Sequence, residues 1–520
     1  MSATVQANTP CLVGAAQFVG REEDPARALS PADMLARVAA DALADAARSS
    51  AEPLVAAAAL ARQIDTLAAI RLFADSGAGA FASPFGTYEN LPWSVAQRLS
   101  AQPAHLIYGP VGGNTPQMLV NMLAERIWRG EAEMCLLVGG EALRTQARAA
   151  KAGLTLDWGE ATPAPPEQPV DDVRMLSAHE AKHGLALPVN VYPLFETAFG
   201  AARGWDLDTH VQRIGALMAP FSEVAAENPY AQVREARTAA ELVTPSEDNR
   251  WIAWPYTKYL VSNLFVDQAG AVLMMASAKA DELGIPEAGR VYLHGSADTH
   301  EKLLPVDRPD YARCPAIRIG AAHALAQAGI GANDLNIVDL YSCFPVAVEL
   351  AAQEIGLSTD DPARLTQTGG LPYFGGAGNA YSMHGIAEIF AKCRAAPDRW
   401  GFVFANGGYL TKHSFGVYSG RPGYGERAEP ASYQAEIDTM PSPALAEAPL
   451  GAGVIEAYTV VHDRGGARFA IIIGRLGEDG GGDRFLANMT EGLGALMQAN
   501  TVGRRITVSA GDKINQAVLA

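Results

Sequence analysis

Two stretches in different halves of the chain repeat one order of elements: an amphipathic helix pattern, a short buried strand and a Gly-Gly pair. In the first, a helix pattern at 114–129 leads into an apolar run at 134–138. In the second, a helix pattern at 383–394 leads into an apolar run at 400–404. The recurrence indicates an internal duplication. Glycine after a buried strand is common, so coincidence stays open on this observation alone.

Short apolar runs alternate with Ala-rich helical patterns elsewhere too, which is the rhythm of an α/β fold. Residues 12–17 predict a strand, and Ser30-Pro31 predicts the start of a helix that continues to about Ala47. At 520 residues the chain is long enough for two to four domains.

Composition excludes several classes of function. The net charge of -17 argues against nucleic-acid binding, which needs a basic surface. The 5 cysteines are scattered, which fits neither a disulfide framework nor a zinc site, so we expect no metal. No apolar run approaches the roughly 20 residues that cross a bilayer, and no secretory signal is evident at the N-terminus. We therefore expect a cytoplasmic protein without a membrane partner.

The residue composition and the pattern of apolar residues change at two places in the chain. Between about 153 and 250, a Pro-rich turn is followed by aromatic residues without strand rhythm, which predicts an inserted cap. From about 426, a Pro-rich linker precedes apolar runs with Gly-rich turns between them, which predicts a small antiparallel barrel. That tail carries more acidic than basic residues, which disfavours single-stranded nucleic-acid binding.

Four motifs together resemble the thiolase superfamily, and sterol-carrier-type thiolases in particular. They are Asn-Arg-Trp-Ile-Ala-Trp-Pro-Tyr-Thr-Lys at 249–258, Asp-Gln-Ala-Gly-Ala at 267–271, Tyr-Ser-Cys-Phe at 341–344 and Gly-Asn-Ala-Tyr-Ser-Met-His-Gly-Ile-Ala-Glu-Ile at 378–389. The resemblance covers about residues 8 to 420. The barrel segment at 453–461 resembles the OB-fold proteins that accompany thiolase-like enzymes as separate subunits, here fused to the chain.

The resemblance implies an α/β fold of duplicated thiolase type, with two βαβαβαββ halves in five αβαβα layers, a cap and a C-terminal OB-like barrel. The expected domains are an N-terminal half at 1–152 and 251–290, a cap at 153–250, a C-terminal half at 291–425 and a barrel at 426–520. Thiolases are usually oligomers, so the resemblance also implies a possible homodimer.

The acyl-carrying cysteine of thiolases aligns with Gly112, in a Gly-rich turn that opens a helix. Covalent acyl transfer through this position is therefore expected to be lost. Gly112, Gly113 and Asn114 form a candidate substrate-binding turn, whose amide groups suit a thioester oxygen or a phosphate. A plain Gly-rich helix entry is the structural alternative.

Cys343 is the candidate acid/base, because the resemblance places it at the catalytic cysteine of sterol-carrier-type thiolases. Pro345 predicts a helix start that puts Cys343 at a helix N-terminus, where its pKa should fall. The alternative is a buried structural thiol. Tyr341 is a candidate substrate-binding residue in the same turn.

Asn379 stands where thiolases have a catalytic histidine, and its amide can donate to an oxyanion but cannot carry a proton. His384 is a candidate substitute base or simply a helix residue, and Asn406 supports the sterol-carrier-type assignment. The remaining candidate substrate-binding residues are the glycines Gly378, Gly407 and Gly408.

The leading hypothesis is an acyl-CoA-handling protein of acyltransferase type, which makes or breaks C–C bonds on CoA thioesters with altered catalytic residues. A retro-aldol-type lyase and a non-catalytic CoA-thioester-binding protein are the alternatives. The implied ligand is acyl-CoA as substrate, and no cofactor is implied.

Overall fold

The computed structural model describes residues 6–76, 81–425 and 427–520. The largest element of the fold is a nine-stranded sheet. The order in that sheet is β3-β2-β4-β7-β1-β8-β11-β10-β9. Its strands are β1 (Pro10–Val19), β2 (Thr66–Ala69), β3 (His105–Tyr108), β4 (Met134–Ala142), β7 (Asp267–Ala276), β8 (Val291–His300), β9 (Ile337–Leu340), β10 (Gly401–Gly407) and β11 (Lys412–Ser419).

The strand order contains a duplication. β2 lies parallel to β4, which pairs antiparallel with β7, which in turn pairs antiparallel with β1. In the second half β9, β10, β11 and β8 repeat these directions in the same order. Cys11 opposite Tyr292 and Leu12 opposite Val291 join the halves edge to edge through β1 and β8. The predicted duplicated thiolase-type fold is confirmed.

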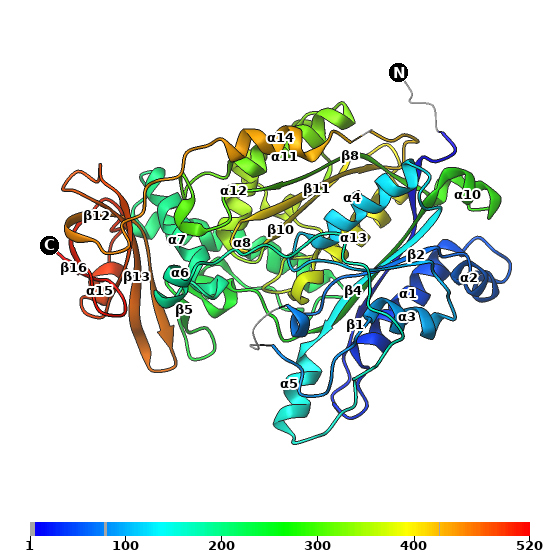
Figure 1. The fold of residues 1–520 in the computed structure, drawn as a ribbon, viewed down its shortest axis with the longest axis horizontal. Coiled ribbons are helices and arrows are strands. Elements are labelled where there is room, and N and C mark those ends of the chain that lie inside the picture. Colours follow the sequence, from blue (N-terminus) through cyan, green and yellow to red (C-terminus); the bar gives the residue numbers. More distant parts are fainter. Residues whose placement is uncertain (1–5, 77–80, 426) are drawn as a thin grey trace.

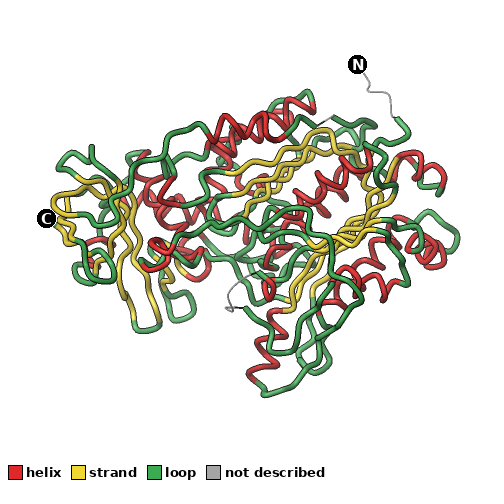
Figure 2. Tube along the Cα trace, in the orientation of Figure 1, coloured by secondary structure: helices red, strands yellow, loops and turns green. Residues whose placement is uncertain are grey.

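Helices α4 (Thr115–Trp128) and α13 (Ser382–Ala395) form the middle layer, because both contact strands of both halves. The sheet curves around them in Figure 2. Helix α1 (Pro31–Ala46) covers the first half and α11 (Pro315–Ala328) covers the second. The predicted start of α1 is present: the Ser30 side chain accepts a hydrogen bond from the Asp33 N–H, and Pro31 is the first helical residue.

The segment expected as a cap contains α6 (Ala178–Lys182), α7 (Pro188–Ala202), α8 (Leu207–Glu227) and α9 (Ala239–Val243). Helix α7 is buried along most of its length, including the polar residues Tyr192 and Glu196. It contacts both α12 (Pro345–Ile355) and the C-terminal barrel, so it lies between them instead of resting on the surface.

The C-terminal region forms a five-stranded barrel at one end of the molecule (Figure 1). Its strands are β12 (Leu450–Asp463), β13 (Gly466–Leu476), β14 (Arg484–Met489), β15 (Arg505–Ser509) and β16 (Gln516–Leu519). β12 pairs with both β13 and β15, which closes the barrel. The predicted C-terminal β-barrel is confirmed, but it is not antiparallel throughout as expected, because β14 and β16 pair in parallel.

Two features near the barrel are not evident from local sequence patterns. β5 (Trp251–Ala253) and β6 (Tyr256–Thr257) join the barrel sheet, with Ala253 opposite Val461 of β12. Helix α14 (Pro430–Asp438) packs on β8 and α11, and its Tyr433 hydroxyl accepts a hydrogen bond from the Asp298 N–H. A segment that precedes the C-terminal half thus pairs with the barrel, and a helix that leads into the barrel packs on the C-terminal half.

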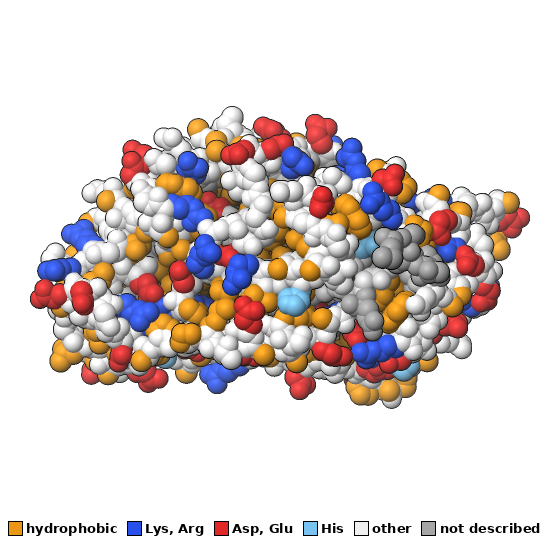
Figure 3. Space-filling view, turned by 90° about the horizontal axis from the view of Figure 1, so that it is seen from above, with side chains coloured by type: hydrophobic (Ala, Val, Ile, Leu, Met, Phe, Trp, Pro, Cys, Tyr) orange, Lys and Arg blue, Asp and Glu red, His pale blue; other side chains and the backbone are white. Residues whose placement is uncertain are grey.

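No helix in the described ranges is long and apolar enough to cross a membrane. On the face drawn in Figure 3, acidic and basic side chains are interspersed. In the same part of the chain, no group of three or more His, Cys, Asp or Glu side chains is arranged to hold a metal ion.

Candidate active site

A cavity of about 570 Å³ lies where five parts of the chain converge: the turns that precede α4 and α12, the loop around Gly378, the end of β10 and helix α7. We call it the central pocket. Much of its wall is apolar. The cap contributes Leu176, Leu187 and Val189 to it, and the segment after β6 contributes Val261 and Leu264. The predicted site residues that line it are Gly112, Gly113, Tyr341, Cys343, Gly378, Asn379, Asn406, Gly407 and Gly408.

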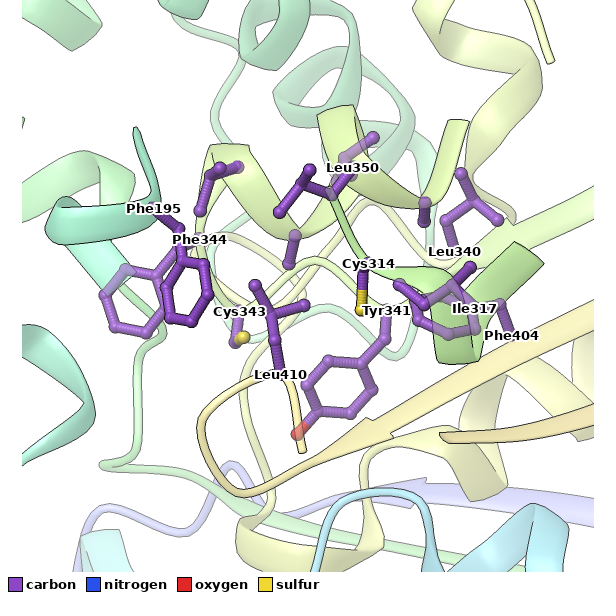
Figure 4. Packing of buried hydrophobic residues seen from close by; sticks show 14 of the residues in the cluster. Phe195, Cys314, Ile317, Leu340, Tyr341, Cys343, Phe344, Leu350, Phe404 and Leu410 are labelled. Carbon is purple, nitrogen blue, oxygen red and sulfur yellow. The ribbon is translucent and has the colours of Figure 1, made fainter. Parts of the chain in front are cut away.

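Cys343 lies in the turn before α12, which begins at Pro345 as predicted. Figure 4 shows Tyr341, Cys343 and Phe344 at this turn. The Cys343 Sγ is 4.0 Å from the Asn406 Nδ2. Burial raises the pKa of the thiol to about 12, so the expected lowering by the helix N-terminus is wrong: desolvation of the thiolate outweighs the helix end and the neighbouring hydrogen bonds. Cys343 is a neutral thiol at physiological pH.

Tyr192 of α7 reaches this thiol from the cap and is not among the residues that the sequence predicts. Its hydroxyl accepts hydrogen bonds from the Asn406 Nδ2, at 2.8 Å, and from the Leu410 N–H, at 3.2 Å. A hydrogen-bonding contact also joins it to Cys343, and its ring stacks on Phe344 with centroids 4.5 Å apart. The hydroxyl of Tyr192 thus connects two of the predicted catalytic residues, Cys343 and Asn406.

Asn379 holds two loops together instead of offering a donor to the pocket. Its Oδ1 accepts a 2.9 Å hydrogen bond from the Gly112 N–H, and its Nδ2 donates to the Arg71 carbonyl oxygen and the Ser76 Oγ. The expected role of this amide as an oxyanion donor is therefore not supported, since both of its N–H groups are engaged. The Gly112 N–H is engaged as well, and the neighbouring Val111 N–H donates to Asp172.

Gly113 permits a close approach of the two halves. A Cβ at this position would lie 2.2 Å from the Tyr341 hydroxyl oxygen and 2.6 Å from the Asn406 carbonyl oxygen, distances at which atoms overlap. Burial raises the pKa of Tyr341 well above its ordinary value, so its phenol is neutral. The glycine turn therefore serves first as a packing surface for the residues of the second half.

Two buried polar atoms on the pocket wall have no hydrogen-bond partner among the described residues. They are the Ser262 Oγ, a potential donor, and the Asn406 Oδ1, an acceptor. Buried polar atoms are normally paired, so these two unpaired atoms mark polar positions in an otherwise apolar wall. Ser262 follows the predicted Asn-Arg…Pro-Tyr-x-Lys motif but is not itself predicted as a site residue.

His384 and Asn114 do not line the central pocket. The His384 Nδ1 is 2.9 Å from the Gln17 Oε1, and burial lowers the pKa of the ring to about 3. His384 is therefore a neutral core residue, which argues against its hypothesised role as a substitute base. Asn114 donates from its Nδ2 to the Ser414 Oγ at 3.2 Å, so it anchors the start of α4 against β11.

A buried carboxyl lies behind the Gly378 loop. Gly378 has a φ of 55°, and a Cβ there would lie 2.5 Å from the Glu141 Oε1. The same oxygen accepts a 2.7 Å hydrogen bond from the Phe73 N–H. Burial raises the pKa of Glu141 to about 8, although its side chain does not line the central pocket.

Within the described residues, the lining of the central pocket contains no Asp, Glu, Lys, Arg or His. Its polar groups are hydroxyls, amides, backbone groups and one thiol, all of them neutral at physiological pH. Such a wall suits a long, uncharged ligand segment with a few hydrogen-bonding groups.

A similar solved structure covers almost the whole chain. A crystal structure of a monomeric SCP2-thiolase like protein type 1 from Mycobacterium smegmatis is 36% identical, with a TM-score of 0.83, and the match covers 99% of this chain and 100% of that one. The family model for the thiolase-like protein type 1 additional C-terminal domain matches residues 432–513.

Two further similarities are partial or more distant. A 3-ketoacyl-CoA thiolase of Pseudoalteromonas translucida (strain TAC 125) is 31% identical over 109 residues, which is 21% of this chain and only 26% of that relative's length. An Ltp2–ChsH2(DUF35) aldolase structure is 16% identical with a TM-score of 0.56, over 80% of this chain and 98% of that one. That last likeness concerns the fold alone.

Proposed function

We propose that this chain, which belongs to the SCP2-thiolase-like protein type 1 family of the thiolase superfamily, binds an acyl-CoA thioester with its acyl group in the central pocket. The observation that carries this proposal is the pair of unpartnered polar atoms, the Ser262 Oγ and the Asn406 Oδ1, in an otherwise apolar and uncharged wall beside the Cys343 thiol. The pantetheine arm of CoA offers amide N–H and C=O groups that complement an acceptor and a donor.

The contacts expected in the complex follow from these atoms. The Ser262 hydroxyl donates to a carbonyl oxygen of the ligand, and the Asn406 Oδ1 accepts from an amide N–H. The Cys343 thiol faces the thioester end. The apolar residues Leu176, Val189 and Leu264 enclose the acyl chain, whose burial contributes roughly 0.8 kcal/mol per CH₂ group.

We further propose that the chemistry, where it occurs, uses Cys343 as a proton carrier without a covalent acyl-enzyme at residue 112. In a retro-aldol step on a β-hydroxyacyl-CoA, the Cα–Cβ bond breaks and the carbon bearing the hydroxyl becomes a carbonyl compound. As that bond breaks, the hydroxyl proton passes to the Cys343 sulfur while the proton of the thiol passes to Cα of the developing enolate, so the thiol is regenerated and the protein ends unchanged.

A non-catalytic acyl-CoA-binding protein is the second candidate. The absence of an ionised side chain from the described pocket wall favours it, and so does the thiol pKa of about 12, because a neutral thiol is a poor base at physiological pH.

Product analysis separates the two candidates. The wild-type protein, Cys343→Ala and a control, Cys11→Ala, are each incubated with a β-hydroxyacyl-CoA and with a β-ketoacyl-CoA, and CoA species are followed by mass spectrometry. Cys11 is also a buried thiol with a pKa of about 12, but it lies in β1 and not on the pocket wall. Turnover lost only in Cys343→Ala supports catalysis, whereas binding without turnover by the wild type supports the second candidate.

The oligomeric state and location are proposals too. The similar mycobacterial protein is described as monomeric, so we propose that this chain is a monomer, in place of the homodimer that the superfamily resemblance suggests. Sedimentation at a mass of 54.8 kDa supports a monomer, and twice that mass supports the dimer. The cytoplasmic location predicted from composition remains a prediction.

A further inference from the structure

A second cavity, of about 490 Å³, opens between α7, α8, α12 and the segment that follows α12. The residues that define it are Phe199, Arg203, Trp205, Arg213, Glu349 and Gln353, and we call it the arginine pocket. None of them lines the central pocket, and the thiolase resemblance assigns no role to any of them. The cavity is thus separate from the proposed acyl-CoA site.

Two guanidinium groups flank one indole ring at this cavity. The Arg213 Cζ lies 4.6 Å from the Trp205 ring centroid, and the Arg203 Cζ lies 5.5 Å from it. Arg203 is held further by stacking on Phe199, at 3.3 Å, and by hydrogen bonds to the Phe199 carbonyl oxygen and the Gln353 Oε1. Aromatic faces therefore hold both cations in place.

Neither arginine forms an ion pair with a carboxylate of the described chain. Arginine binds phosphate and carboxylate groups through two parallel N–H groups, and little further ordering is needed when the side chain is already held. The two arginines therefore have the chemistry of an anion-binding site.

The buried carboxyl pair of Glu196 and Glu349 lies close enough to Arg203 to interact with its charge, but it offsets that charge only in part. Burial, followed by the neighbouring carboxylate of Glu196, raises the pKa of Glu349 well above its ordinary value, so Glu349 is neutral. Glu196 is engaged by Tyr256, whose hydroxyl donates to it at 2.5 Å, and by the His210 Nε2 at 2.6 Å. Asp360 is an exposed residue at the rim that accepts a hydrogen bond from Ser358.

We propose that the arginine pocket binds a small organic anion, with its phosphate or carboxylate group between Arg203 and Arg213 and an apolar body against Trp205. Leu217 and Leu357 complete the apolar side of the cavity. The inference does not depend on the acyl-CoA proposal, because the two cavities share no lining residue.

Calorimetric titration at low salt tests the proposal with three probes: phenyl phosphate, benzoate and inorganic phosphate. Phenyl phosphate is expected to bind saturably and at least about tenfold more tightly than inorganic phosphate, because only the former covers the indole. Arg213→Gln is expected to weaken binding of phenyl phosphate roughly tenfold. Arg234→Gln, an exposed arginine outside the cavity, is expected to bind like the wild type.

Arg203→Gln is a second test, but Arg203 also ties Phe199 to Gln353, so its fold is checked by thermal unfolding. Arg213 is exposed, and its side chain forms no hydrogen bond with the described residues, so Arg213→Gln is expected to fold normally. Saturable binding lost in Arg213→Gln supports the proposal. No binding by any probe, binding unchanged in Arg213→Gln, or equal affinity for phenyl and inorganic phosphate overturns it.

Discussion

The backbone N–H of Gly112 donates a 2.9 Å hydrogen bond to the Oδ1 of Asn379, across 267 residues of sequence. These are the two positions at which the thiolase resemblance places the acyl-carrying cysteine and the catalytic histidine. Here they bind each other, and the Nδ2 of Asn379 binds the chain at Arg71 and Ser76. The bond joins the halves of the fold at a place where the resemblance predicts two separate catalytic groups.

Replacing Asn379 by Ala is expected to destabilise the protein by roughly 1–3 kcal/mol, because the buried Gly112 N–H and the Arg71 carbonyl lose their partner. Denaturant unfolding measures the change. Asn336→Ala is the control. The side chain of the exposed Asn336 accepts a single hydrogen bond within the described residues, from the Trp400 N–H, so a smaller loss is expected. Equal losses in the two variants contradict the assigned role of Asn379.

Restoring a cysteine at residue 112 is not expected to restore a thiolase nucleophile. Gly112 has a φ of 146°, and a Cβ would lie 2.6 Å from the Asn114 Oδ1 and 3.0 Å from the Lys412 Nζ. Gly112→Cys should therefore cost roughly 1–3 kcal/mol of stability. Gly153→Cys is the control. Gly153 also has a positive φ, of 67°, but a Cβ there would meet no atom within 4 Å. The control therefore measures the cost of backbone strain without a collision. A stable Gly112→Cys that forms an acyl-enzyme, detected by mass spectrometry, contradicts this expectation.

Much of the main fold is predictable from local patterns. The predicted strand at 134–138 is the core of β4, and the predicted helices at 114–129 and 383–394 are α4 and α13. These elements have buried apolar runs or long helical periodicity, which are the most reliable signals in a sequence. The duplication follows because both halves carry the same signals in the same order.

The parts of the site that sequence does not reveal depend on contacts over long separations. Tyr192 lies 214 residues before Asn406, and nothing in the local sequence marks its hydroxyl as a partner of that amide. The pKa of Cys343 could not be predicted for the same reason. The sequence predicts the helix start at Pro345, but the burial that raises the pKa depends on the whole fold. The pairing of β5 with β12 likewise depends on a distant strand.

Alkylation of Cys343 by a small neutral thiol reagent is expected to be slow at pH 7 and to accelerate about tenfold per pH unit towards pH 12, because only the thiolate reacts. Peptide mapping assigns the label to Cys343. Because its folded pKa lies above its ordinary value of 9.0, this thiol contributes stability that is fully present below about pH 9 and is lost as the pH rises towards 12. An alkylation rate that levels off near pH 8 contradicts the raised pKa.

Tyr192→Phe is expected to lower both stability and acyl-CoA affinity, because the Asn406 Nδ2 and the Leu410 N–H lose their acceptor. A stability loss of roughly 1–3 kcal/mol is expected from the unpaired buried groups. Tyr409→Phe is the matched control: Tyr409 also lines the pocket, but its hydroxyl donates to the Ala186 carbonyl in the cap. Equal affinity losses in both variants indicate a general effect on the pocket and contradict a specific role for Tyr192.

The most direct test of the account is calorimetric titration of octanoyl-CoA and free CoA into the wild type, Leu176→Trp and Leu54→Trp. Leu176 lines the central pocket, whereas Leu54 is 79% exposed on α2 (Pro53–Ala61). We predict that the wild type binds octanoyl-CoA saturably and binds free CoA more weakly. In Leu176→Trp the two affinities become equal, because the indole fills the space of the acyl chain. In Leu54→Trp the difference between the two affinities is kept. Equal affinities of the wild type for both ligands, or an octanoyl-CoA affinity that Leu176→Trp leaves unchanged, would contradict acyl binding in the central pocket.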